Sequence, residues 1–376
     1  MQIKTLKTLF NSSKEDSLFG RYIHYDSIAP LLEKLNEKFQ IEDVGKSVNG
    51  IPIRSVTFGF GDKKILMWSQ MHGNESTTTK AIFDLFNAVA NTNESIDCIL
   101  EHCTIKVIPI LNPDGAKAYT RLNANAIDLN RDAQELSQPE SKVLRAVFDS
   151  FKPDFCFNLH GQRTIFSAGH TPNSATVSFL APAQDAKRSL TTTRKIAMEI
   201  IIAMNKNLQR QIQNRVGVYD DSFNLNCVGD TFQSEGVPTV LFEAGHAAND
   251  YMREETRALI FQSLVIALDC IALNTLTGVN YESYFDIPEN QKKFYDIIIR
   301  NTNGLDVAVQ FQEVLKENSI NFVPKIEKIS DLKNFYAHKE IDAKGYQVFG
   351  KNNTTISEAN EIDFVMINNE KFLLKP

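Results

Sequence analysis

The chain has 376 residues, of which 43% are hydrophobic, and its 40 Lys and Arg against 46 Asp and Glu give a formal net charge of -6. A chain of this length can bury a large core and hold one large domain with a smaller one. The slightly acidic balance argues against a nucleic-acid or anionic-membrane partner, because such partners are bound by concentrated positive charge. We also find no uninterrupted apolar run of the roughly 18 residues that a membrane span needs, so we expect neither partner.

The cysteines and the N-terminal residues indicate a reduced compartment. The five cysteines are scattered, odd in number and without a CxxC pair, which argues against a disulfide framework. Residues 1–11 lack the apolar segment and small-residue cleavage site of a signal peptide. We therefore expect a cytoplasmic protein, and the sequence leaves its oligomeric state open.

From about residue 40 to 275 the chain alternates short β-rich runs with amphipathic helices, which is typical of an α/β layered domain. Apolar runs predict buried strands over residues 65–70, 103–111, 155–159, 177–180 and 239–242. A hydrophobic period of 3.6 residues predicts helices around residues 82–89, 143–151 and 197–208. A longer helix is expected over residues 251–273.

The composition changes after residue 277, where Lys, Asn and short β-like runs become common. Such runs occur at residues 308–311, 346–349 and 363–367. We therefore predict a main domain over residues 1–280, which carries the chemistry, and a small, mostly β appended domain over residues 286–376.

The segment Met71-His72-Gly73-Asn74-Glu75 lies directly after a predicted strand and before a predicted helix. A His and a Glu three residues apart on a tight turn can converge on one ion, and zinc accepts both ligand types. A catalytic zinc also needs a third protein ligand and an open position for water. Taken alone, this pair is more typical of a solvent-facing turn without a metal than of a metal site.

His160 is the candidate for the third ligand, because it ends the predicted strand at residues 155–159. Sites in open α/β sheets form outside the carboxyl ends of strands, where both His72 and His160 are expected. The alternative is a histidine that only hydrogen-bonds a nearby carbonyl. His246 is a reserve ligand three residues after Glu243.

Glu243 follows the apolar strand predicted at residues 239–242. A carboxylate in such a place is costly to bury unless it is paired or coordinated. It is therefore either the partner of an arginine in a salt bridge or a general base that takes the proton of a zinc-bound water.

Polar residues gather in the loop that follows the strand at residues 103–111. Arg121, Asn130 and Arg131 are suited to bind a carboxylate in the bidentate manner, or they pair with surface acids. Asp128 is suited to accept a hydrogen bond from a metal-binding histidine and so to fix its tautomer.

Together these segments resemble the zinc metallocarboxypeptidase family, the relatives of pancreatic carboxypeptidase A, over roughly residues 40 to 275. The segments that carry the resemblance are His72-Gly-Asn-Glu75, Asn112-Pro-Asp-Gly115, Arg121 with Asp128-Leu-Asn-Arg131, Asn158-Leu-His160 and Phe242-Glu243. The resemblance implies a mixed central sheet with helices on both faces. It also implies one Zn2+ per chain, held by His72, Glu75 and His160 with Asp128 behind His72.

The resemblance further implies roles toward a peptide substrate. Arg121 would polarise the scissile carbonyl, while Asn130 and Arg131 would bind the terminal carboxylate. Glu243 would activate the zinc water and then protonate the leaving amine. Tyr219 is the candidate for the family's mobile tyrosine.

The residue that sets side-chain preference in this family falls near residues 228–230. Asp230 either points into the pocket and favours a basic substrate end, or serves as a structural residue of a helix or turn.

We thus predict hydrolysis of C-terminal residues from short peptides. The alternative is a zinc deacylase of small N-acylated amino acids, since the chain also resembles aspartoacylase and succinylglutamate desuccinylase in its His-Gly-Asn-Glu and Asp-Leu-Asn-Arg segments and its C-terminal β domain. The Asn112-Pro-Asp-Gly115 segment and the spacing from Arg121 to Arg131 favour the peptidase. A metal-free binding protein is a third hypothesis, against which the intact set of ligand residues argues.

Overall fold

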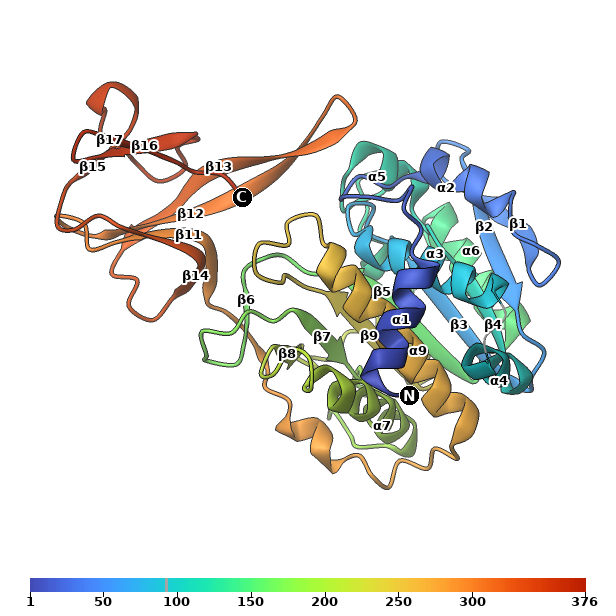
Figure 1. Ribbon diagram of the computed structural model, residues 1–376. Coiled ribbons are helices and arrows are strands. Elements are labelled where there is room, and N and C mark those ends of the chain that lie inside the picture. Colours follow the sequence, from blue (N-terminus) through green and yellow to red (C-terminus); the bar gives the residue numbers. More distant parts are fainter. Residues whose placement is uncertain (92–93) are drawn as a thin grey trace.

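The computed structural model describes residues 1–91 and 94–376. Its main part is built on an eight-stranded sheet with the order β1-β2-β4-β3-β5-β9-β7-β8 (Figure 1). The strands are β1 (Gln40–Lys46), β2 (Pro52–Phe58), β3 (Lys63–Ser69), β4 (Cys103–Ile108), β5 (Phe155–Gly161), β7 (Val177–Leu180), β8 (Val216–Val218) and β9 (Thr239–Ala244). The four central strands β4, β3, β5 and β9 are parallel. Antiparallel pairs join β1 to β2, β2 to β4 and β7 to β9, whereas β8 is parallel to β7. The sheet is therefore mixed, as predicted.

Helices cover both faces of this sheet. One face packs on α1 (Ile3–Ser13), α3 (Thr77–Ala90), α4 (Glu94–His102), α7 (Thr192–Leu208) and α9 (Glu254–Leu273), and the other on α6 (Pro139–Phe151) and α8 (Val228–Ser234). The alternation along β3 explains this arrangement, because Ile65 and Met67 enter the first core and Leu66 and Trp68 the second. Short helices α2 (Tyr25–Leu32), α5 (Pro113–Ala118) and η1 (Leu129–Arg131) lie in the connections.

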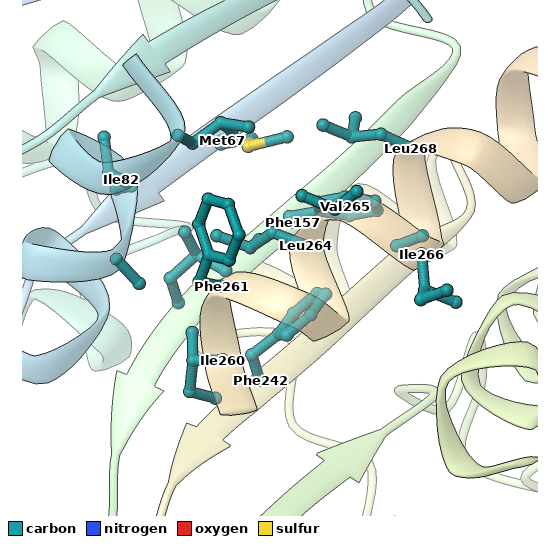
Figure 2. Close-up of a cluster of buried hydrophobic side chains, with 14 of the residues drawn as sticks. Met67, Ile82, Phe157, Phe242, Ile260, Phe261, Leu264, Val265, Ile266 and Leu268 are labelled. Carbon is teal, nitrogen blue, oxygen red and sulfur yellow. The ribbon is translucent and has the colours of Figure 1, made fainter. Parts of the chain in front are cut away.

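Helix α9 is the centre of the larger core. Its side chains, with Phe261, Leu264 and Val265 among them, pack on Met67 and Phe157 from the sheet (Figure 2). Within residues 1–91 and 94–376, α9 is the one helix long and apolar enough to span a membrane by length and composition, and 78% of its apolar window is buried inside the protein. Such burial is that of a core helix. Charged residues interrupt its apolar sequence, so it contains no uninterrupted apolar run of the length that a membrane span needs.

The C-terminal part is rich in β-structure and has a further hydrophobic core, to which Tyr251 of the main part also contributes. It begins after the short helix η2 (Glu282–Asp286) and forms a four-stranded sheet, a three-stranded sheet and one strand that joins the main part. The strands are β10 (Asn290–Lys292), β11 (Phe294–Arg300), β12 (Asp306–Lys316), β13 (Ser319–Ser330), β14 (Tyr336–Asp342), β15 (Val348–Phe349), β16 (Phe364–Ile367) and β17 (Glu370–Leu373), with the short helix η3 (Lys351–Asn353). The domain limits at residues 280 and 286 stay a prediction.

The two parts are joined by backbone pairing and by polar side chains. Strand β10 pairs antiparallel with β6 (Phe166–Ala168) of the main part. From β12, Glu313 accepts hydrogen bonds from Arg21 at 3.1 Å and from the Tyr119 hydroxyl at 2.5 Å. Gln310 of the same strand donates to Thr164 at 2.7 Å. These contacts bring one end of the long hairpin β12–β13 next to the carboxyl ends of the central strands.

Candidate active site

The turn after β3 carries the first two candidate ligands, and its backbone is strained. Gln70 adopts a positive φ of 45°, which is costly for a residue with a side chain and occurs at functional sites. Its Nε2 donates to the carbonyl of Gly73 at 2.7 Å and to that of Ile23 at 3.0 Å. The side chain of Gln70 thereby holds the turn in which His72 lies.

The His-Gly-Asn-Glu turn packs directly on the Asn-Pro-Asp-Gly turn. A Cβ atom on Gly73 would lie 1.9 Å from the backbone carbon of Gly115, so only glycine allows this approach. Asn112 joins the turns, because its Nδ2 donates to the Met71 carbonyl at 3.2 Å and its Oδ1 accepts from the Gly115 amide at 2.8 Å. The two sequence segments are therefore one structural unit.

His72, Glu75 and His160 come together as one group. The Nδ1 of His72 lies 3.0 Å from Oε1 of Glu75 and 3.1 Å from Nδ1 of His160, which lies 2.9 Å from Oε2 of Glu75. Zinc binds such atoms at about 2.0–2.2 Å, so ligands that share one ion lie roughly 3 to 3.5 Å apart. Two imidazole nitrogens that face each other also need a cation or a proton between them. The donor set therefore fits zinc.

Asp128 holds the other side of His72. Its Oδ1 lies 3.0 Å from Nε2 of His72 and also accepts from the Asn130 amide at 2.9 Å. Burial alone would lower the pKa of His72, but the carboxylates of Glu75 and Asp128 raise it above its ordinary value. A carboxylate behind a histidine fixes which ring nitrogen faces the metal.

The structure also decides between the alternatives for the two other histidines. Nδ1 of His160 faces Glu75 and His72, which does not fit the capping alternative. His246 is buried but lies outside this group, and its ring packs against Tyr251 and His338. It is therefore not placed to act as a reserve ligand.

Glu243 is the last but one residue of β9, directly across from His160 in β5. Its Oε2 is buried and, among the described residues, has no hydrogen-bond partner. Burial and the neighbouring carboxylate of Glu75 raise the pKa of Glu243 well above its ordinary value, and Arg121 opposes this rise. Because no arginine within residues 1–91 and 94–376 forms an ion pair with it, the salt-bridge alternative does not apply.

Arg121 lies beside the metal group and is partly open to solvent, with 45% of its side chain exposed. Its Nη1 is 3.5 Å from Oε1 of Glu75, and its Nε is 3.1 Å from Oδ2 of Asp128. The guanidinium is thus held by two carboxylates of the site while one side remains accessible to a ligand.

Asn130 and Arg131 lie on η1, next to the start of α8. Oδ1 of Asn130 accepts from the Val228 amide at 3.0 Å, which leaves its Nδ2 as the group for a ligand. Arg131 is exposed, and its Nη1 lies 2.6 Å from the Asn130 carbonyl and 3.1 Å from the sulfur of Cys227. No pattern in the sequence predicts Cys227 at this place.

Tyr219 and Asp230 are the remaining candidates. The ring of Tyr219 packs edge-on against Phe166, with 5.3 Å between the ring centroids. Burial raises the pKa of Tyr219 well above its ordinary value, and the carboxylates of Glu243 and Glu75 add to the rise. Oδ1 of Asp230 accepts from the Asn224 amide at 3.2 Å, which favours the structural alternative for that residue.

A cavity that the sequence did not predict adjoins the metal group. It holds about 320 Å³ and is lined by Glu75 and Arg121 together with Arg21, Arg253 and Glu313. The last three come from the N-terminal segment, the start of α9 and β12. No spacing in the sequence links these three residues. The two arginines can be recognised as candidate ligand-binding residues only from their burial in the folded chain.

The fold and this group place the chain among α/β proteins in which two histidines and one glutamate are arranged as they would be to hold a metal ion. The chain belongs to the zinc carboxypeptidase family, whose model matches residues 25–272, and the resemblance seen in the sequence is confirmed. Carboxypeptidase 2 of Trichophyton rubrum is 29% identical over 100 residues, which are 26% of this chain and 19% of that protein. Carboxypeptidase E of Caenorhabditis elegans is 26% identical over 153 residues, 34% of this chain and 32% of that protein. The matches thus span a third or less of these two curated relatives.

Solved structures show the same fold. A metallo-carboxypeptidase from Burkholderia cenocepacia aligns with a TM-score of 0.52 at 18% identity and covers 65% of this chain and 68% of its own. A metallo-carboxypeptidase from Pseudomonas aeruginosa, in complex with (2-guanidinoethylmercapto)succinic acid, aligns with a TM-score of 0.51 at 16% identity over 65% of this chain and 69% of its own. At such identities the likeness concerns the fold alone.

Proposed function

We propose that this protein is a zinc-dependent metallocarboxypeptidase that hydrolyses the C-terminal amide bond of short peptides. The observation that carries the proposal is the meeting of a two-histidine, one-glutamate group with the Glu243 carboxylate on the next strand, whose Oε2 is unpaired among the described residues. His72, Glu75 and His160 would hold one Zn2+ per chain, with Asp128 fixing His72. Bound zinc would supply a Lewis acid for the scissile carbonyl and would lower the pKa of water.

The residues around the group divide the remaining work. Arg121 is an accessible cation beside the group and would stabilise negative charge as it develops on the carbonyl oxygen. Glu243 would take a proton from the attacking water at its carboxylate and deliver it to the leaving nitrogen. Its Oε2 is buried and has no hydrogen-bond partner within residues 1–91 and 94–376, so no neighbour in this part of the chain competes with water for that atom.

The end of the substrate would be bound on the side of η1. Arg131 is exposed there beside Asn130, and a guanidinium with an amide can bind a terminal carboxylate in a planar, bidentate manner. Binding the free carboxylate restricts cleavage to chain ends. Tyr219 would close over this end.

The deacylase of N-acylated amino acids is the second candidate, because the C-terminal part borders the cavity next to the metal group. A bordered cavity favours a small acyl group over a long peptide. Both candidates use the same residues and differ only in what precedes the amide.

The test is a side-by-side assay of the purified protein on C-terminal peptides, including γ-glutamyl and diaminopimelate-containing peptides, and on N-acyl amino acids. We expect release of the C-terminal residue from short peptides, loss of activity with a chelator and recovery with Zn2+. A clear preference for N-acyl amino acids would overturn the peptidase proposal in favour of the deacylase. Full activity in the chelated protein would overturn both.

A further inference from the structure

The cavity beside the metal group lies between the two parts of the chain. Glu75 and Arg121 line it from the metal group, while Gln310, Glu313 and Phe322 line it from the β12–β13 hairpin. Its volume of about 320 Å³ is at the lower end of the roughly 300–1,000 Å³ of small-molecule sites. The space is therefore suited to a small group rather than to a long chain.

The position of the cavity assigns it a side of the substrate, given the proposed function. Asn130, Arg131 and Tyr219, which would bind the substrate's C-terminal end, are not among its lining residues. A substrate that places its carboxylate on Arg131 and its scissile amide at the metal group therefore directs its acyl part into the cavity.

Two buried arginines give this cavity its chemistry. The side chain of Arg21 is 9% exposed, and Arg253 is 1% exposed. Arg253 donates to the carbonyls of Ala244 and Gln162, yet its Nε is buried and unpaired among the described residues. Nε and Nη1 of Arg21 are also buried and have no hydrogen-bond partner among the described residues, while its Nη2 donates to Glu313. Buried donors without acceptors are costly, so a ligand with acceptor oxygens is expected here.

The charges that face the cavity leave these arginines incompletely neutralised. The charged lining residues are Arg21, Arg121, Arg163, Arg253, Glu75, Asp296 and Glu313. Each of the acids is already engaged: Glu75 by the histidines, Glu313 by Arg21 and Tyr119, and Asp296 by the Tyr251 hydroxyl and the Phe311 amide. Burial, with the repulsion from Arg21, lowers the pKa of Arg253 to about 10.

We propose that this cavity is the subsite for the acyl side of the scissile bond and that it accepts a residue with a side-chain carboxylate, bound by Arg21 and Arg253. The β12–β13 hairpin forms the far wall of the subsite and limits the length of the substrate. This gives the C-terminal part a role in choosing substrates.

The test compares two dipeptides, Glu-X and Gln-X, where X is the C-terminal residue that the wild-type protein releases fastest. The two differ only in a carboxylate and a carboxamide, so their ratio of kcat/KM reports the subsite and cancels general damage to the enzyme. We expect a ratio of at least about 10 in favour of Glu-X, in line with hydrogen bonds between charged groups. Arg21→Gln is expected to bring the ratio close to one.

The matched control is Arg300→Gln, because Arg300 pairs with Glu340 in the C-terminal sheet and does not line the cavity. It is expected to keep the wild-type ratio. Glu313→Gln is the second variant, and it keeps the proposal testable if Arg21→Gln does not fold. Since it removes the acid that competes for Arg21, it should raise the ratio. Equal rates on Glu-X and Gln-X in the wild type, or an unchanged ratio in both variants, would overturn the subsite.

Calorimetric binding of glutarate to the metal-free protein separates this proposal from the proposed function. We expect binding that Arg21→Gln weakens about tenfold and Arg300→Gln leaves unchanged. Such binding without hydrolysis of any peptide would support the anion subsite and overturn only the carboxypeptidase proposal. Hydrolysis with no Arg21-dependent binding would overturn only the subsite.

Discussion

His160 and Glu243 are direct neighbours across the parallel strands β5 and β9. The backbone of the sheet therefore fixes the separation between a candidate metal ligand and the candidate base, since adjacent strands lie about 4.8 Å apart. A base on a flexible loop would need further contacts to keep its place. Here the ladder of hydrogen bonds between β5 and β9 keeps Glu243 in place, and its buried Oε2 has no hydrogen-bond partner in the part of the chain that the structure describes.

The first prediction concerns Glu243→Gln. The amide keeps the size of the side chain but cannot accept a proton from water. We expect zinc content like that of the wild type and a fall in kcat of about 10²- to 10⁴-fold, the usual contribution of general acid–base catalysis. Peptide turnover and metal content of the same preparation are the measurements.

Glu199→Gln is the matched control. Glu199 is a buried carboxylate outside the metal group, and it accepts hydrogen bonds from the backbone amides of Gly278 and Asn280. Its turnover should stay near that of the wild type. If Glu243→Gln turns over substrate at the wild-type rate, another group acts as the base.

The second prediction concerns the metal group. The double variant His72→Ala/His160→Ala should lose the single zinc that we expect per chain, because only Glu75 remains of the three ligands. Asp128→Asn should keep the ion but weaken its affinity about 10- to 100-fold, the usual effect of removing the carboxylate behind a histidine. Atomic absorption and chelator competition measure both effects. His102→Ala, at an exposed histidine, serves as control, and full metal retention in the double variant would contradict the assignment.

Much of the metal group could be predicted from the sequence because its residues follow apolar runs. The runs that precede His72 and end in His160 and Glu243 form the adjacent central strands β3, β5 and β9. Parallel strands carry their C-terminal residues to one edge, so residues 88 positions apart, such as His72 and His160, meet there. The order of the motifs along the chain and their places at the ends of strands were therefore sufficient to predict which residues form the group.

The cavity could not be predicted, because its contacts join segments without a shared pattern. Arg21 and Glu313 are 292 residues apart, and both lie outside any run with a clear period. The hydrogen bond from the Val228 amide to Asn130 could not be predicted for the same reason, since η1 and α8 come together only in the folded chain. Hydrophobic patterns predict elements, whereas polar contacts between distant elements depend on how those elements dock.

The third prediction concerns Gly73→Ala. The added methyl would lie 1.9 Å from the backbone of Gly115, so one of the two turns has to move. We expect a loss of about 1–3 kcal/mol in the free energy of unfolding, as for overpacked sites, and weaker zinc binding because His72 and Glu75 flank the glycine. Urea denaturation and zinc competition measure these effects.

Gly229→Ala in α8 is the control for that variant, since its added methyl meets the Cγ of Pro182 at 3.2 Å rather than backbone. Zinc affinity should be unchanged in it. Unaltered stability and zinc affinity in Gly73→Ala would show that the two turns are not rigidly joined.

The fourth prediction concerns the pH dependence of stability through Asp296 in β11. Burial raises its pKa to about 6, although the Tyr251 hydroxyl, the Gln310 amide and the Phe311 backbone N–H all donate to its carboxylate. A carboxyl group with a raised pKa in the folded state binds its proton more tightly there than in the unfolded chain. Its stabilising effect is therefore complete below the unfolded value of 3.8 and is lost as the pH rises through about 6.

Asp296→Asn removes this titration, so the difference in unfolding free energy between variant and wild type should shift in favour of the variant between pH 4 and pH 7. With about 1.4 kcal/mol for each unit of pKa difference, the shift should be about 2–3 kcal/mol. Urea denaturation of both proteins at several pH values measures it, and Asp16→Asn, at an exposed carboxylate, is the matched control. A difference that stays constant across this range, or moves in favour of the wild type, would mean that the three donors outweigh burial and keep Asp296 charged.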